Sequence, residues 1–281
     1  MKKSIKKIHN ALEAHMPGLS TWQALPNRTI EYLDPFILLN HHGPETYSAN
    51  NNGLPFGPHP HRGFETLTFV FDGDIVHEDS TGQRHVSEAG DVQWMTAGKG
   101  IIHSEVSSEN FKKEGGDLEI LQLWMNLPGR LKMTPPAYKG YKAEELTQIS
   151  LDDGKVRAHL ISGELMGQKG PHESLTDLTL SYVHLQKGGM FAPEVPVGRT
   201  VFLYIVRGSL SADGQSLNAR QVVEFERENE TIALEANENA LILFGHGKPL
   251  NEPKVAQGPF VMNTVGELKQ AFLDYQAGKF A

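Results

Sequence analysis

The chain has 281 residues and a formal net charge of −8, because 34 Asp and Glu residues outnumber 26 Lys and Arg residues. Hydrophobic residues make up 39% of the chain, enough for the core of one large domain or of two medium domains. The acidic balance argues against direct, sequence-independent binding to nucleic acids, and the absence of cysteine excludes disulfides, zinc–thiolate sites and iron–sulfur clusters.

Targeting signals are not recognisable in this sequence. The longest uninterrupted apolar run covers residues 201–206, far short of the about 20 residues that span a membrane. The N-terminus carries lysines, but no apolar segment follows them as in a secretion signal. We therefore expect a cytoplasmic protein without membrane contact.

Short apolar segments alternate with glycine turns along most of the chain. Segments rich in β-branched and aromatic residues predict strands at 66–71, 92–95, 119–124, 201–206 and 240–244. Many short strands at close spacing are typical of all-β sandwiches and barrels. The sequence therefore predicts an all-β fold.

Histidines gather in the first half, where seven of the 13 lie between His41 and His103. The pair His59 and His61 precedes the predicted strand 66–71. Residues two apart in an extended chain share a face, so we expect both imidazoles and the Glu65 carboxylate to point the same way. The same face continues with apolar residues, so the polar ligands would lie next to a packed apolar core.

A second polar pair follows a glycine turn at residues 98–100. His103 and Glu105 share one face of a predicted strand at 101–105. Three histidines and a carboxylate give a nitrogen and oxygen site without sulfur, which suits Fe(II), Mn, Ni, Co, Cu(II) or Zn. The remaining histidines of the cluster are interpreted as surface or core residues: His41, His42, His77 and His85.

The middle of the chain is rich in proline and then polar through residues 142–153, as in a linker. Segments 68–73 and 203–208 are similar, since each is an apolar strand that ends at a glycine turn. When these turns are aligned, Glu194 and Pro196 occupy the positions of the two leading histidines. We therefore expect a second, metal-free barrel.

One helix is predicted near the C-terminus. Thr264 and Glu267 form a capping-box pattern, in which each side chain satisfies a backbone N–H of the first turn. Apolar residues follow at helical spacing and predict packing against a barrel: Leu268, Ala271, Phe272 and Tyr275.

Residues 58–66 resemble the first metal-binding motif of the cupins, and residues 90–105 resemble the second. The residues of the second motif resemble those of the pirin family, and so do segments 121–128 and 258–264. The resemblance therefore covers nearly the whole chain. It implies a bicupin, two packed antiparallel β-barrels of the jelly-roll (double-stranded β-helix) type with a short C-terminal helix. We expect a metal-binding barrel at 1–134 and a degenerate barrel at 135–281.

The resemblance also implies a single metal in the first barrel, with His59, His61, His103 and Glu105 as its ligands. Iron is the first expectation for this divalent transition metal, and Mn, Ni, Co, Cu and Zn stay open. Glu65 fills the place of the carboxylate ligand of other cupins, but following the pirins we expect it beside the ligands.

The activity that the resemblance implies is a quercetin 2,3-dioxygenase type of reaction, in which O2 cleaves a flavonol or a similar enol. Glu105 would accept the proton of the substrate hydroxyl. Candidate pocket residues are Phe56, Phe64, Trp94, Met95, Gln122 and Trp124. The alternative is a non-catalytic, metal-bound and redox-sensitive regulatory protein with a protein partner that the sequence does not identify.

Overall fold

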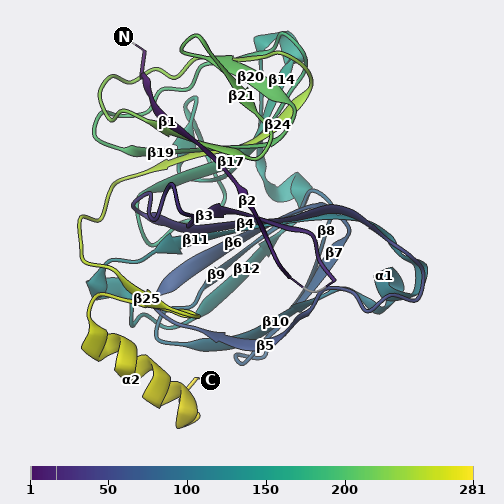
Figure 1. The fold of residues 1–281 in the computed structure, drawn as a ribbon, viewed down its shortest axis with the longest axis vertical. Coiled ribbons are helices and arrows are strands. Elements are labelled where there is room, and N and C mark those ends of the chain that lie inside the picture. The colour runs from purple at the N-terminus through teal and green to yellow at the C-terminus, as the bar shows by residue number, and fades with distance from the viewer. Residues whose placement is uncertain (1, 17, 281) are drawn as a thin grey trace. The chain divides into compact units, whose positions relative to one another are not determined.

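The structure is a computed structural model that describes residues 2–16 and 18–280 (Figure 1). Strands form most of the described secondary structure, and antiparallel pairing joins the central strands of both large sheets. The predicted all-β class is confirmed. Within the described residues, no helix has the length and apolar character needed to cross a membrane.

The described residues form two compact units whose segments alternate along the chain. We call one the histidine unit; it consists of Glu13–Gln23, Phe36–Ala143 and the segment from Leu250 onward. The second unit consists of the segment up to Leu12, Ala24–Pro35 and Glu144–Pro249. Each end of the chain thus joins the unit built from the opposite half. The predicted division into 1–134 and 135–281 stays a prediction.

The histidine unit contains two main sheets. The larger has the order β12–β9–β6–β11–β4–β3–β2, with bounds Ala137–Tyr141, Val92–Thr96, Phe64–Asp72, Gly116–Asn126, Phe36–Tyr47, Thr21–Leu25 and Leu12–Ala14. The smaller has the order β5–β10–β7–β8, with bounds Phe56–His61, Ile101–Val106, Asp74–Asp79 and Arg84–Glu88. The hairpin of β25 and β26 and two helices complete this unit: Val255–Gln257, Phe260–Met262, α1 (Glu109–Glu114) and α2 (Val265–Gln276).

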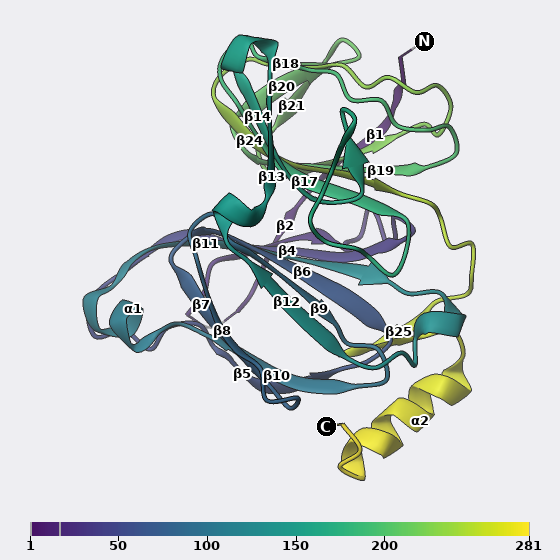
Figure 2. The same cartoon turned by 180° about the vertical axis from the view of Figure 1, so that it is seen from behind.

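The second unit repeats this plan (Figure 2). Its larger sheet has the order β1–β22–β19–β24–β17–β14–β13, with bounds Ile5–Asn10, Gln221–Phe225, Thr200–Arg207, Ala240–Gly247, Leu178–Leu185, Val156–Ser162 and Thr147–Leu151. Its smaller sheet has the order β18–β23–β20–β21, with bounds Met190–Phe191, Leu234–Ala236, Ser209–Ala212 and Gln215–Asn218. A hairpin joins β15 and β16, Glu164–Leu165 and Gln168–Lys169.

All six predicted strands fall inside observed strands, namely β6, β9, β10, β11, β19 and β24. The predicted polar linker is less irregular than its composition suggests, because it contains β13 and the short 3-10 helices Ala143–Glu145 and Asp152–Gly154. A further 3-10 helix, Gly129–Leu131, follows the proline-rich stretch. The helix α1, which the sequence analysis did not predict, begins where the Ser108 side chain accepts a hydrogen bond from the N–H of Phe111.

The two sheets of the second unit pack against each other through an apolar core. Leu203 and Phe244 come from its larger sheet, and Phe191 and Leu210 come from its smaller sheet; all four are fully buried. The rings of Phe191 and Phe244 pack edge to face at 5.2 Å. Burial of apolar surface between the two sheets therefore holds this unit together.

The predicted capping box is confirmed at α2. Thr264 accepts a hydrogen bond from the N–H of Glu267, whose carboxylate accepts one from the N–H of Thr264. Leu268 and Ala271 are buried, as predicted, and pack with Phe260 of β26. This helix therefore belongs to the histidine unit, although it lies in the second half of the sequence.

One local expectation is wrong. His59 and His61 lie on β5 of the smaller sheet, whereas Glu65 lies on β6 of the larger sheet. Gly63 separates the two strands with a φ of 90°, and a Cβ there would lie 2.0 Å from the carbonyl oxygen of Val261. The chain therefore turns between the sheets at this glycine and does not continue as one strand.

Candidate metal centre

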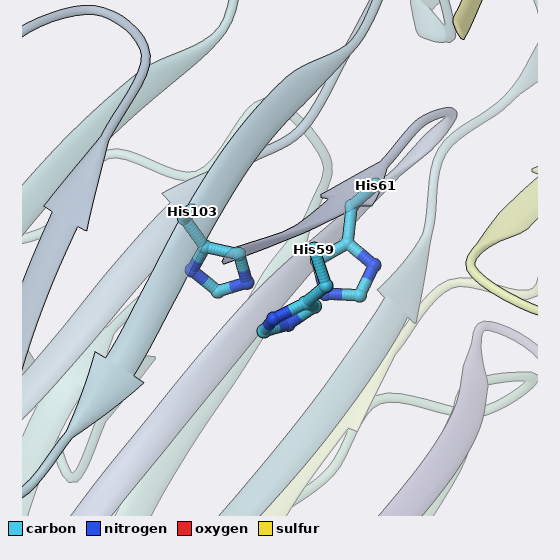
Figure 3. A group of neighbouring side chains, drawn as sticks. All are labelled: His59, His61 and His103. Atoms are coloured by element: carbon cyan, nitrogen blue, oxygen red, sulfur yellow. The ribbon is translucent and has the colours of Figure 1, made fainter. Parts of the chain in front are cut away.

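The pairing of β5 with β10 brings three predicted ligands together. His103 lies directly opposite His59, and Ile101 lies opposite His61, so the three imidazoles share one face. One ring nitrogen from each of the three lies within 4.8 Å of the other two. Figure 3 shows the rings converging from the two strands. Among the described residues, no second group of three such ligand side chains lies equally close.

Burial favours the neutral, ligating form of His61 and His103. It lowers the pKa of His61 to about 3, with the neighbouring His59 adding to the effect and the carbonyl of Pro259 opposing it. Burial, together with the other histidines, also lowers the pKa of His103 well below its ordinary value. A neutral imidazole keeps a lone pair for a metal ion at neutral pH.

Several of the ring nitrogens are available. The buried Nε2 of His103 and both buried ring nitrogens of His61 lack a partner with normal hydrogen-bond geometry. His59 is oriented from behind, because its Nδ1 lies 2.7 Å from the carbonyl oxygen of Gly57. A carbonyl only accepts, so Nδ1 of His59 carries the hydrogen and its Nε2 is left free. Buried, unpartnered nitrogens facing one another are what a bound transition metal would satisfy.

Glu105 lies on the same face of β10 as His103, as predicted, and both side chains are buried. It is not a member of the close group of donor atoms. Its Oε1 accepts hydrogen bonds from Gln93 at 2.5 Å and Thr68 at 3.2 Å, and its Oε2 accepts one from Gln122 at 2.6 Å. These donors come from the larger sheet and hold the carboxylate between the two sheets.

Both amides are themselves oriented by neighbours. The hydroxyl of Tyr138 donates to Oε1 of Gln93, and the indole N–H of Trp124 donates to Oε1 of Gln122. Each amide oxygen is therefore occupied, and each NH2 group faces Glu105. Gln122 was a predicted pocket residue; Gln93 and Tyr138 were not recognised in the sequence.

An aromatic wall stands beside His61. The Phe64 ring stacks on Trp124 at 4.3 Å, and both rings lie about edge-on to the imidazole, at 5.2 and 5.0 Å. Phe64 is fully buried and Trp124 is partly exposed. These two predicted pocket residues therefore contact the histidine group directly.

The other residues predicted beside the ligands or in the pocket make different contacts. Glu65 accepts hydrogen bonds from Trp94 at 3.1 Å and Thr96 at 2.6 Å, on the face of the larger sheet opposite to Thr68 and Gln122. The structure thus brings Glu65 and Trp94 together, but away from the three histidines. Met95 packs with Ala97, Ile101 and Tyr138. The ring of Phe56 lies 5.2 Å from that of His42, which is not one of the three predicted histidine ligands.

The sequence analysis also missed His77, which it interpreted as a core or surface residue. His77 lies on β7, opposite Glu105, and its Nδ1 is 3.4 Å from Nδ1 of His103. The spacing of His77 and Asp79 matches that of His103 and Glu105, which was a usable signal. The antiparallel pairing of β7 with β10, which brings the two pairs together, is not visible in the sequence.

The second unit has a pocket of about 840 Å³ that contains none of the predicted ligands. The pocket is lined in part by Glu194 and His246. Nε of Arg199 donates to Nδ1 of His246 at 2.7 Å, and the same guanidinium pairs with Asp177. Burial, with Arg199 adding to it, lowers the pKa of His246 to about 3. This imidazole is engaged by an arginine and not by other imidazoles.

Comparison with known proteins gives the chain's relatives. The family model described as Pirin matches residues 18–125, and that described as Pirin C-terminal cupin domain matches residues 180–281. The chain is 38% identical over 250 residues to a Pseudomonas aeruginosa protein named "Putative quercetin 2,3-dioxygenase PA2418", covering 89% of this chain and 87% of the relative. It is 35% identical to Pirin-1 of Arabidopsis thaliana, covering 98% and 93% of the two chains.

A solved structure agrees with the fold. The crystal structure of a quercetin 2,3-dioxygenase from Acinetobacter baumannii matches with a TM-score of 0.94 and 35% identity, covering 100% of this chain and 99% of the other. The predicted bicupin fold is thereby confirmed. Because both family models and full-length relatives match, the chain belongs to the pirin family.

Proposed function

We propose that this protein is a metal-dependent dioxygenase of the quercetin 2,3-dioxygenase type. It would cleave flavonols or similar enols with O2 at a single site formed by His59, His61, His103 and Glu105. The observation that carries this proposal is the group of three imidazoles, whose ligand nitrogens lie within 4.8 Å of one another, with buried nitrogens that lack a partner of normal hydrogen-bond geometry. The names of the Pseudomonas and Acinetobacter relatives support the choice of reaction.

The three histidines fit a divalent transition metal, because neutral imidazole is a good ligand for iron, manganese, nickel, cobalt, copper and zinc alike. Iron is our first choice among these metals. When bound, such a metal supplies a Lewis acid for the enol oxygen and, if redox-active, the electronic means of reaction with O2. Glu105 is proposed as the fourth ligand, since it shares the buried face of β10 with His103.

Glu105 is also proposed as the base. Its Oε1 or Oε2 would accept the proton of the 3-hydroxyl of a flavonol, which leaves the enolate oxygen free to bind. Gln93 and Gln122 hold the carboxylate within the site, and Tyr138 and Trp124 fix the orientation of these two amides. This support positions the base before the substrate arrives.

The aromatic wall would bind the substrate. Phe64 and Trp124 present stacked rings beside His61, which suits a flat aromatic ligand. The partly exposed Trp124 lies on the open side of this wall, and the buried Phe64 supports it. A substrate ring against Trp124 would place its enol oxygen close to the three imidazoles.

The test is oxygen uptake with quercetin by metal-reconstituted protein, with carbon monoxide release as a second readout. Wild-type protein should consume one O2 per flavonol cleaved, and His61→Ala, which removes one of the three imidazoles, should show no turnover. Each preparation is first assayed for bound metal. Protein that is loaded with Fe, Mn, Ni, Co or Cu and yet consumes no O2 would contradict the proposal and favour the non-catalytic regulatory role.

A further inference from the structure

A chain of hydrogen bonds continues from His103 away from the three-histidine group. Nδ1 of His103 lies 3.4 Å from Nδ1 of His77, and Nε2 of His77 lies 2.9 Å from Oδ2 of Asp79. The β7–β10 pairing places these residues side by side, with Asp79 opposite His103. The side chains of His77 and Asp79 have no exposed surface.

Asp79, at the far end of this series of hydrogen bonds, is held by the turn between β7 and β8. Oδ1 of Asp79 accepts hydrogen bonds from the N–H and the hydroxyl of Thr81 at 2.8 and 2.6 Å, and from the N–H of Gln83 at 3.3 Å. Burial alone would raise the pKa of Asp79, but the hydrogen bonds from Thr81 and His77 outweigh it and lower the pKa. Asp79 is therefore a carboxylate anchored in a tight turn.

The direction of each hydrogen bond follows from the chemistry of the groups. An ionised carboxylate only accepts, so Nε2 of His77 carries a hydrogen. In neutral His77 the other nitrogen, Nδ1, then has a free lone pair and accepts from Nδ1 of His103. With its hydrogen on Nδ1, His103 has its lone pair on Nε2, the buried nitrogen without a partner.

We propose that His77 and Asp79 are positioning residues that hold His103 in the tautomer and ring orientation needed for metal binding. This inference rests on the metal site assigned under the proposed function. Outer partners of this kind orient a ligating histidine and raise its basicity. The β7–β8 turn thus becomes part of the metal site, although neither residue belongs to the cupin motifs.

The ring of His77 is itself held by stacking. It lies against Tyr138 of β12, with ring centroids 3.9 Å apart and planes 13° from parallel. The hydroxyl of Tyr138 acts on the other side of the site, since it donates to Gln93, which donates to Glu105. Tyr138 therefore supports both a proposed imidazole ligand and the proposed carboxylate ligand, by different atoms.

Because the ring and the hydroxyl of Tyr138 make different contacts, matched variants can separate them. His77→Phe keeps a ring against Tyr138 but removes both nitrogens, and His77→Asn restores an acceptor near Nδ1. Asp79→Asn removes the charge from the anchor. Tyr138→Phe keeps the stack on His77 and removes only the hydroxyl that supports Gln93. His85→Asn is the control, because it replaces another imidazole, which lies opposite His77 on β8.

The experiment measures Co(II) affinity by competition with a chromophoric chelator, together with the visible absorption spectrum of the bound Co(II). We expect His77→Phe to weaken Co(II) binding by about 10- to 100-fold and to change the spectrum. Asp79→Asn should have a smaller effect in the same direction. His77→Asn should recover most of the affinity, and His85→Asn should bind Co(II) within about twofold of wild type. Tyr138→Phe should weaken Co(II) binding less than His77→Phe does, because it keeps the stack on His77 and loses only the hydroxyl that supports Gln93.

Wild-type affinity and an unchanged spectrum in folded His77→Phe would overturn the inference. If that variant does not fold, the comparison of His77→Asn and Asp79→Asn with His85→Asn decides in the same way. The two proposals fail differently. Wild-type protein that binds Co(II) in a His77-dependent manner but never turns over quercetin would refute the dioxygenase and leave the positioning role intact. Wild-type protein that binds no Co(II) would refute the metal site and this inference with it.

Discussion

The two units share a plan of sheets but differ in what fills them. In the second unit, apolar residues from both sheets form a continuous core around Leu203 and Phe244. In the histidine unit, apolar residues of the two sheets also meet, as Val70 and Ile75 do, but beside them lies a polar network in which Glu105 of one sheet accepts hydrogen bonds from amides of the other. Two units with the same plan of sheets therefore differ in the side chains that face inward, and the proposed chemistry depends on those side chains and not on the plan.

The comparison continues at single positions. The turn alignment places Glu194 and Pro196 of the second unit where the histidine unit has His59 and His61. His246, on β24 of the second unit, is bound to Arg199, whereas the imidazoles of the other unit face one another. Because Arg199 donates to Nδ1 of His246, the lone pair of that nitrogen is occupied by a hydrogen bond and is not available to a metal ion.

The largest expected effect tests this contrast directly. His61→Ala should reduce bound metal from about one ion per chain to nearly none, a greater loss than the roughly 10- to 100-fold effect of an outer partner. His246→Ala and Glu194→Gln, both in the second unit, should leave the metal content unchanged. Elemental analysis after reconstitution and desalting measures all three. Metal retained by the first variant, or lost from either of the others, would break the comparison.

A core substitution in each unit should separate their stabilities. Phe260→Ala in the histidine unit and Phe191→Ala in the second unit each remove a fully buried ring and should cost about 3–5 kcal/mol of stability. Added metal should raise the melting temperature of Phe260→Ala more than that of Phe191→Ala, because it binds only the folded histidine unit. Thermal melts with and without Co(II) test this. Equal restoration of both variants would show that the units unfold together.

Acid should weaken the second unit through His246. Its pKa is about 3 in the folded protein against an ordinary 6.5, so below pH 6.5 the unfolded chain binds a proton that the folded chain does not. Stability is therefore lost as the pH falls, by roughly 2 kcal/mol between pH 7 and pH 5. His246→Gln should lose about that much less over the same interval in urea titrations. Identical losses in both proteins would exclude this contribution.

The smallest expected effect concerns α2, which packs on the histidine unit. Thr264→Ala removes the hydrogen bond to the N–H of Glu267 and should cost about 1 kcal/mol of stability. Thr264→Ser keeps a hydroxyl at the same place and should be nearly neutral. Chemical denaturation curves of the two variants provide the measurement. A Thr264→Ala curve that overlays the wild-type curve would indicate that the cap contributes nothing in the folded protein.

Local signals in the sequence predicted much of the fold and the centre of the site. Segments rich in β-branched and aromatic residues located strands, and the Thr264 and Glu267 pattern located the helix that they cap. The two histidine motifs located the imidazoles that the structure brings together. Each of these predictions depends on residues close to one another in the chain, where spacing alone determines which side chains share a face.

What the sequence did not reveal depends on contacts between distant segments. The turn at Gly63 moves Glu65 to another sheet, because the carbonyl of Val261, about 200 residues away, leaves no room for a side chain there. His77 reaches His103 only through the pairing of β7 with β10, and Gln93 reaches Glu105 only across the two sheets. Such contacts are set by tertiary packing and carry no local periodicity.

The exchanged ends of the chain bear on how the protein is made. During synthesis the strands that carry the histidines leave the ribosome long before the segment from Leu250 onward, on which their unit depends. That late segment supplies the carbonyl of Val261, which accepts a hydrogen bond from the buried Lys132, and Asp274, which pairs with Arg62. A premature stop near residue 250 would thus leave the second unit complete, although most of it is translated later. It would damage the histidine unit, most of which is translated first. Both units can be completed only when translation is nearly finished.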